Sequence, residues 1–153
     1  MDLFDIVGPV MIGPSSSHTA GAARIGRVTR RLLGRQPDEA DVAFHGSFAK
    51  TWQGHGTDRA IVGGLLDMNV DDERLRIAPE LAEQAGMRVA FRTISLRGAH
   101  PNSVVIAASC ADGASVTVRA ASVGGGAILV ESINGMQVGF SGEADTIVIQ
   151  HRD

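Results

Sequence analysis

Apolar and polar positions alternate with two different periods along this chain, and the change of period divides it into two halves. In the first half, apolar residues recur every three or four positions, which predicts helices over residues 17–33, 57–66 and 78–85. In the second half, alternation with a period of two predicts strands over residues 87–95, 103–110, 114–121, 127–133, 136–140 and 145–150. A further strand is expected at residues 41–48, after a short lead-in at residues 2–7.

Turn and cap residues agree with these boundaries. Gly34 suits the C-terminal cap of the first helix, and Pro79 suits the first turn of the third. Asp112-Gly113 and Asn134-Gly135 are typical hairpin turns. Because helices cluster in the first half and antiparallel strands in the second, the sequence predicts an α+β fold rather than a doubly wound parallel sheet.

Composition narrows the class of protein. A chain of 153 residues with 44% hydrophobic and 20% charged residues predicts one soluble domain, and no apolar run is long enough for a membrane span. The acidic first residues argue against a secretory signal, so we expect a cytoplasmic protein. A net charge of -3 and 4% aromatic residues disfavour nucleic-acid binding.

Two residue counts exclude kinds of chemistry. The single cysteine, Cys110, cannot form an internal disulfide or hold an iron–sulfur cluster unaided, and we expect it to be a buried small apolar residue. The single lysine, Lys50, in so small a chain disfavours a pyridoxal phosphate enzyme.

The first predicted helix carries a group of five arginines, and two interpretations of them stay open. They form either a solvated helix face, which is the commoner outcome, or a surface that docks a partner or an anion. The five are Arg24, Arg27, Arg30, Arg31 and Arg35.

The densest group of polar chemistry lies at residues 13–21, Gly-Pro-Ser-Ser-Ser-His-Thr-Ala-Gly, which open directly into the first helix. Pro14 makes the corner rigid, and the backbone N–H groups at a helix start attract a carboxylate or phosphate. A helix cap needs only one hydroxyl, so this run offers more donors than capping requires. We predict that His18 acts in catalysis and that the neighbouring hydroxyls bind substrate, namely Ser15, Ser16, Ser17 and Thr19.

A second polar loop, Gly54-His55-Gly56-Thr57-Asp58, also stands just before a helix. The flanking glycines let the backbone approach a ligand closely. The ordinary pKa of histidine, about 6.5, suits His55 to act as a general base. Asp58 can orient an imidazole, and Thr57 or Asp58 can cap the helix. We predict His55 as catalytic and Gly54, Gly56, Thr57 and Asp58 as substrate-binding.

Other segments give weaker signals. His100 and Asn102 flank Pro101 in a loop that is either a simple turn or a contact for a zwitterion. Gly124–Gly126 is either a loose connection or a site of close backbone approach. His45 is expected to be a packed core residue.

A zinc site is a competing interpretation of the histidines. His18, His55 and His100 match no zinc signature, so no metal site is predicted in this chain.

Taken together, these motifs resemble the β subunit of the bacterial iron–sulfur-dependent L-serine dehydratases, or L-serine ammonia-lyases. The resemblance covers nearly the whole chain. It rests on Phe4-Asp5-Ile6, residues 8–21, Gly46-Ser47-Phe48-Ala49, residues 54–58 and 60–66, His100-Pro101-Asn102 and residues 122–126.

The resemblance implies conversion of L-serine to pyruvate and ammonia without pyridoxal phosphate. It implies that a separate α subunit carries a 4Fe-4S cluster, which acts as Lewis acid on the serine hydroxyl, and that this chain is inactive alone. His55 matches the likely base, and His18 faces the same cleft. His100 and Asn102 match a loop that contacts substrate or an effector.

The resemblance also implies a mixed sheet with helices mainly on one side, and a homodimer or heterotetramer. The β-type domain is similar to the allosteric substrate-binding domain of some phosphoglycerate dehydrogenases, and an ACT domain usually follows it. Residues 1–153 are therefore expected to be the β domain, with the ACT domain missing. Two rival functions stay open: a purely regulatory amino-acid-binding domain, and a phosphate-binding or hydrolase domain.

Overall fold

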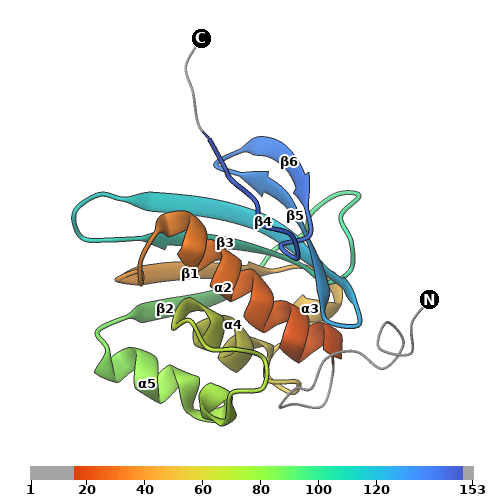
Figure 1. The fold of residues 1–153 in the computed structure, drawn as a ribbon. Helices are drawn as coiled ribbons and strands as arrows, with labels where there is room; N and C mark the ends of the chain where they lie inside the picture. Colours follow the sequence, from red (N-terminus) through yellow and green to blue (C-terminus); the bar gives the residue numbers. More distant parts are fainter. Residues whose placement is uncertain (1–15, 150–153) are drawn as a thin grey trace.

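One sheet of six strands organises the computed structural model, which describes residues 16–149. The strand order is β2-β1-β3-β4-β5-β6 (Figure 1). Neighbouring strands are antiparallel except β1 and β2, which are parallel. The sheet is therefore mixed and mostly antiparallel, and the predicted α+β class is confirmed. The strands are β1 Glu39–Phe44, β2 Arg88–Thr93, β3 Ser103–Ser109, β4 Ser115–Gly124, β5 Ala127–Ile133 and β6 Met136–Phe140.

The helices pack as one layer on one face of this sheet (Figure 1). The first predicted helix begins with a π-helical turn and continues as α-helix to Gly34, whose φ of +89° ends it. The segment between the parallel strands β1 and β2 crosses the helical layer, as parallel pairing requires. The helices are η1 Ser16–Gly21, α2 Ala22–Leu33, α3 Gly46–Thr51, α4 Thr57–Leu65, η2 Glu73–Ile77 and α5 Ala78–Gln84.

The core lies between the two layers. Alternate residues of β1, β3 and β4 face the helices, so Val42, Ile106 and Val118 are fully buried. Ile25 and Ile61 cover them from α2 and α4. This arrangement leaves the other face of the sheet without a helical layer among the described residues.

Two glycines allow α2 and α4 to touch backbone to backbone. A Cβ on Gly26 would lie 2.4 Å from the Ile61 carbonyl oxygen, and one on Gly64 would lie 2.1 Å from that of Ala23. Neither position can accept a side chain without moving a helix. The close contact fixes the first half of α2 against the second half of α4. The predicted histidine loops lead into these two helices.

The arginines of α2 bind neighbouring segments of the protein. Arg27 pairs with Asp67 at 3.0 Å, and Arg30 donates to the Leu65 carbonyl at 2.9 Å. Arg24 donates to the Gly126 carbonyl at 2.9 Å. Arg35, which follows α2, donates to Cys110 Sγ at 3.2 Å. Four of the five arginines thus hold segments of the fold together, whereas Arg31, 4.0 Å from Asp67, makes no hydrogen bond within residues 16–149.

Two strand predictions were wrong, one over its last residues and one over all of its described residues. Residues 41–48 do not continue as a strand, because Gly46 takes a φ of +63° and α3 begins there. A Cβ on Gly46 would lie 2.3 Å from the Pro101 carbonyl oxygen, so this turn depends on a tertiary contact. The part of the predicted last strand that the structure describes, residues 145–149, is irregular and exposed.

The turns follow the sequence more closely. Asn134 and Gly135 have φ values of +50° and +80°, as a two-residue primed hairpin turn requires. Gly125 and Gly126, at +59° and +82°, form the same kind of turn between β4 and β5. The glycine run is therefore a tight hairpin turn, and a Cβ on Gly124 would meet no atom within 4 Å.

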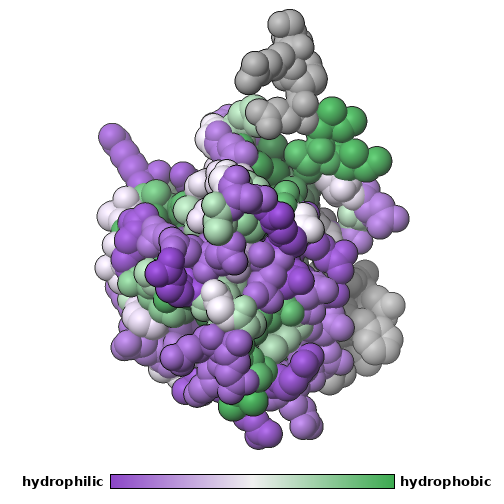
Figure 2. Space-filling view, turned by 90° about the vertical axis from the view of Figure 1, so that its left-hand side faces the viewer, coloured by the Kyte–Doolittle hydropathy of each residue, from purple (hydrophilic) through white to green (hydrophobic). Residues whose placement is uncertain are grey.

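The surface is polar over most of the face shown in Figure 2, with an apolar group beside the C-terminal residues. Ile147 and Ile149, exposed by 85% and 76%, are the most exposed large apolar side chains among the described residues. No helix within residues 16–149 is long and apolar enough to cross a membrane.

Candidate functional site

Five segments meet at one end of the sheet, where β1 ends and β3 begins. They are residues 16–21, 45–48, 54–58, 100–103 and 122–126, at the right-hand end in Figure 1. A Cβ on Gly21 would lie 2.0 Å from the Ser122 hydroxyl oxygen, and Ser122 N–H donates to the Asn102 carbonyl at 3.0 Å. Ser47 N–H donates to the Pro101 carbonyl at 2.7 Å. The fold thus gathers the described parts of the polar and glycine motifs into one region.

The two predicted catalytic histidines lie side by side in this region. The ring centroids of His18 and His55 are 5.0 Å apart, with an angle of 34° between the rings. Phe48 packs edge-on against His18 at a centroid distance of 5.2 Å. The imidazole of His18 therefore contacts both Phe48 and the imidazole of His55.

The surroundings of His18 favour its neutral form. Burial lowers the pKa of His18 most, and the nearby His55 lowers it further, while a backbone hydrogen bond with Ser47 acts in the opposite direction. The net effect brings the pKa below its ordinary value of 6.5. These surroundings therefore disfavour the imidazolium form of His18.

The start of α4 presents polar groups beside His55. Gly56, with a φ of +70°, occupies the N-cap position and makes no side-chain cap bond, so the predicted cap at Thr57 or Asp58 was wrong. Thr57 is fully buried. Burial raises the pKa of the Asp58 carboxyl, and the backbone N–H of Arg59 lowers it in part.

This end of the fold also collects unsatisfied polar atoms. Within residues 16–149, five buried side-chain oxygens have no hydrogen-bond partner, and each belongs to one of the five segments. They are Thr19 Oγ1, Thr57 Oγ1, Asp58 Oδ1, Asn102 Oδ1 and Ser122 Oγ. A buried polar oxygen without a partner costs about 1–3 kcal/mol. Such a concentration is typical of a place where a polar ligand supplies the missing partners.

The remaining predicted site residues divide between this region and the surface. Ser17 and Asn102 are half-buried, whereas His100 and Gly54 are exposed. His100 Nδ1 accepts a hydrogen bond from Asn102 N–H at 3.0 Å, so this imidazole shapes its own loop. Ser15 lies outside the described residues, and of Ser16 only the backbone is described.

Sequence reasoning did not assign Arg24, Ser122 or Ser47 to this region. Arg24 ties the β4–β5 turn to α2, and Ser122 reaches Gly21 at the start of that helix. Serine and arginine are common on strands and helices, so these residue types alone did not indicate a site. For Ser47 and Ser122, only the neighbouring glycines indicated that their segments were of interest.

His45 and Cys110 have structural surroundings. His45 is half-buried, and its Nδ1 accepts a hydrogen bond from Leu96 N–H at 3.0 Å. Cys110 is buried at the opposite end of the sheet, where Arg35 Nε donates to its sulfur at 3.2 Å. No group of three or more His, Cys, Asp or Glu side chains within residues 16–149 could hold a metal ion.

Comparison of the sequence with known proteins identifies the family of this chain. A family model described as "Serine dehydratase beta chain" matches residues 1–90. The chain belongs to this family. The "Probable L-serine dehydratase, beta chain" of Bacillus subtilis is 50% identical over 151 residues, which cover 99% of this chain and 68% of that protein.

Other serine dehydratase relatives support the assignment. The "L-serine dehydratase, beta chain" of Peptoniphilus asaccharolyticus is 45% identical over 149 residues, covering 97% of this chain and 67% of the relative. The "L-serine dehydratase" of Streptomyces coelicolor is 31% identical over 160 residues, but these cover only 35% of that protein. The similarity to the beta chains therefore extends over nearly all of this chain.

Proposed function

We propose that this chain is the β subunit of an L-serine ammonia-lyase, which converts L-serine to pyruvate and ammonia together with a separate α subunit. The observation that carries the proposal is the pair of imidazoles, His18 and His55, 5.0 Å apart among buried oxygens that lack partners in the described part of the chain. Family membership supports the substrate, because the relatives are named as L-serine dehydratases.

The polar atoms around the histidines suit a small zwitterion. Serine carries an ammonium group, a carboxylate and a hydroxyl, and each needs a partner when it leaves water. The Asp58 carboxylate matches the ammonium, and the hydroxyls of Thr19, Thr57 and Ser122 match the oxygens. In this proposal the substrate satisfies atoms that residues 16–149 leave unsatisfied.

His55 acts as the base in this proposal and takes the proton from Cα of serine. Its new positive charge then lies about 5 Å from His18. Two cations at that distance would repel by roughly 3 kcal/mol at an effective dielectric constant of about 20. Because the pKa of His18 is lowered, His18 stays neutral and this repulsion does not arise. The aminoacrylate formed by loss of water then hydrolyses to pyruvate and ammonia.

The residues of this chain do not fit a 4Fe-4S cluster. Such a cluster takes four thiolate ligands, and the chain has one cysteine, at the end of the sheet away from the histidines. We propose that the α subunit holds the cluster. In this proposal the serine hydroxyl leaves at the part of the site that the α subunit forms. This chain supplies the base and part of the substrate pocket.

The test is anaerobic mixing of this chain with a cluster-loaded α subunit, followed by measurement of pyruvate from L-serine. We expect pyruvate from the mixture and none from either component alone. Full activity from the α subunit alone would overturn the proposal and favour the regulatory alternative.

A further inference from the structure

A cavity of about 600 Å³ lies far from the histidines, between α2 and the β5–β6 hairpin. The irregular segment 141–149 runs along its open side. Small-molecule sites in proteins have volumes of about 300–1000 Å³, so the cavity has room for a metabolite. It shares no residue with the candidate site, and the inference below does not depend on the proposed function.

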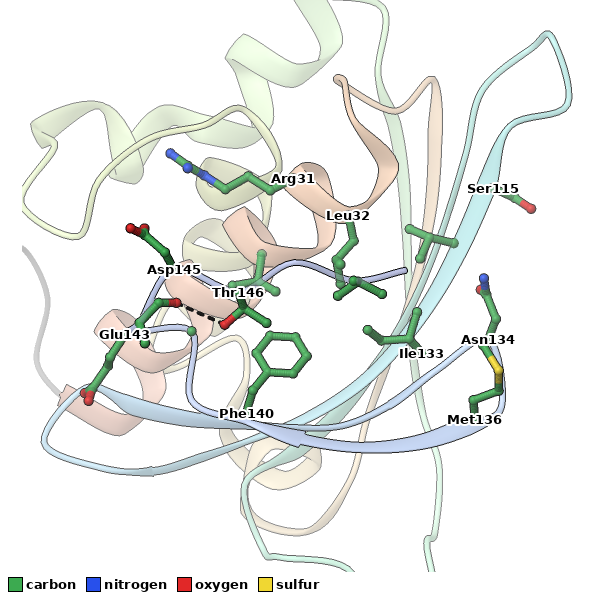
Figure 3. Close-up of a pocket in the computed structure, with 15 residues that line it drawn as sticks. Arg31, Leu32, Ser115, Ile133, Asn134, Met136, Phe140, Glu143, Asp145 and Thr146 are labelled. Atoms are coloured by element: carbon green, nitrogen blue, oxygen red, sulfur yellow. Dashed lines mark hydrogen bonds between the residues drawn. The ribbon is translucent and has the colours of Figure 1, made fainter. Parts of the chain in front are cut away.

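One end of the cavity carries opposite charges that are not paired with each other. Figure 3 shows Arg31 and Asp145 on the same side, with Glu143 turned away from the centre. Arg31 lies 4.0 Å from Asp67 and its side chain is 64% exposed. Asp145 makes no ion pair within residues 16–149. A guanidinium and a carboxylate are thus both open to a ligand.

The middle of the cavity is apolar, and the polar Ser115 and Asn134 lie beyond it at the other end (Figure 3). Leu32 of α2, Ile133 at the end of β5 and Phe140 at the end of β6 line the apolar middle, as Figure 3 shows. Ile133 is 5% exposed, and Leu32 and Phe140 are half-buried. An aliphatic group placed among them would leave water, which stabilises a complex by about 0.8 kcal/mol per methylene.

We propose that this cavity binds an L-α-amino acid with an apolar side chain. The carboxylate pairs with Arg31, the ammonium pairs with Asp145, and the side chain contacts Leu32, Ile133 and Phe140. A zwitterion with an aliphatic body matches both the charged end and the apolar middle of the cavity. A fatty acid would leave Asp145 unpaired, and an alkylamine would leave Arg31 with Asp67 as its partner and without a ligand carboxylate.

The segment that supplies Asp145 is lightly held, which lets a ligand enter. Its side-chain hydrogen bonds are local: Glu143 N–H donates to Ser141 Oγ at 3.3 Å, and Thr146 Oγ1 donates to the Ala144 carbonyl at 3.0 Å. Every residue from 141 to 149 is exposed. Binding at Asp145 would therefore order this segment over α2.

The test is calorimetric titration of the whole chain with L-leucine as the probe. We expect saturable binding, and at least about tenfold weaker binding of L-alanine, of 4-methylpentanoate and of 3-methylbutylamine, since each lacks one of the three contacts. Arg31→Gln and Asp145→Asn should each weaken leucine binding by about tenfold or more. Both side chains are exposed, so the variants should fold.

Matched controls keep the result specific. Arg76→Gln and Asp71→Asn change exposed side chains away from the cavity and should leave leucine binding unchanged. Absence of saturable heat at millimolar leucine would overturn the proposal. So would equal losses in the cavity variants and the controls, or equal binding of leucine and 4-methylpentanoate.

Discussion

The two ends of the sheet treat their polar groups in opposite ways. At the end away from the histidines, charged side chains pair with each other: Arg35 with Asp112, and Arg88 with Glu39. Asp38 accepts the Ala111 N–H at 2.7 Å. At the histidine end, the described buried oxygens of Thr57, Ser122 and their neighbours have no partner.

This difference separates stability from function. Polar groups that serve the fold find their partners within the chain, as the ion pairs do, although exposed pairs add at most about 1 kcal/mol each. Polar groups left unsatisfied at one place cost the fold free energy, and a ligand or a partner subunit can repay it. The predictions below test this contrast between the two ends.

The largest effect should come from removing the proposed base. His55→Gln, assayed with the α subunit, should lower the rate of pyruvate formation by about 10²–10⁴-fold, the usual contribution of general base catalysis. Lys50→Gln is the control, because Lys50 is exposed on the neighbouring helix α3 and should leave the rate unchanged. Unaltered turnover in the His55→Gln enzyme would show that His55 is not the base in this reaction.

The next effect concerns the helix contact that positions both histidine loops. Gly64→Ala would bring a Cβ 2.1 Å from the Ala23 carbonyl oxygen and 2.7 Å from Arg27 N, so a helix must move. Displacement costs about 3 kcal/mol, and the better helix propensity of alanine offsets about 1 kcal/mol. We expect a net loss of about 2 kcal/mol in the free energy of unfolding, measured by urea titration.

The control for this substitution lies on the edge strand. Gly139→Ala meets no atom within 4 Å, and Gly139 does not have a positive φ. It should leave the unfolding midpoint unchanged. Equal stability of Gly64→Ala and Gly139→Ala would show that α2 and α4 are not in close contact.

Local patterns were enough to predict much of this fold. The helix predicted over residues 57–66 is α4, and Asn134-Gly135 forms the predicted hairpin turn. In both cases the signal lies within the segment itself. The strand predicted over residues 41–48 failed because Gly46 turns to accommodate Pro101, a contact between distant residues that no local pattern contains.

The candidate site was predictable in part for the same reason. His18 and His55 stand in motifs whose glycines and hydroxyls exceed what a turn or cap needs, so the sequence alone singles both out as candidates. Their 5.0 Å approach depends on the packing of α2 on α4, which the sequence does not display. Ser122 enters the region only through its contact with Gly21, and its strand gave no reason to single it out.

Two fully buried threonines offer a closer test of the contrast. Thr29 Oγ1 donates to the Ile25 carbonyl at 2.9 Å, whereas Thr57 Oγ1 has no partner among the described residues. Thr29→Val should therefore lose about 1 kcal/mol of stability. Thr57→Val should gain about 1 kcal/mol, because it removes an unsatisfied hydroxyl, and should raise KM for serine.

One result for the Thr29→Val and Thr57→Val variants would contradict this prediction. Urea unfolding followed by fluorescence of Trp52, the only tryptophan in a chain without tyrosine, gives both stabilities. Similar losses in the two variants would mean that Thr57 is satisfied in solution. Its hydroxyl would then belong to the fold, and the contrast between the ends would not extend to α4.

The smallest effect should be a pH dependence of stability caused by His18. Its pKa is lowered in the folded chain, so below pH 6.5 the unfolded chain binds more protons than the folded chain. Stability is therefore complete above pH 6.5 and falls as the pH decreases through the range between the two pKa values. Asp58 acts in the opposite direction, because its raised pKa makes the folded chain bind more protons in acid.

Urea midpoints above and below pH 6.5, measured in an Asp58→Asn background, give the pH dependence of stability without the contribution of Asp58. His18→Gln should flatten that dependence, and an unchanged slope would mean that His18 is not buried beside His55.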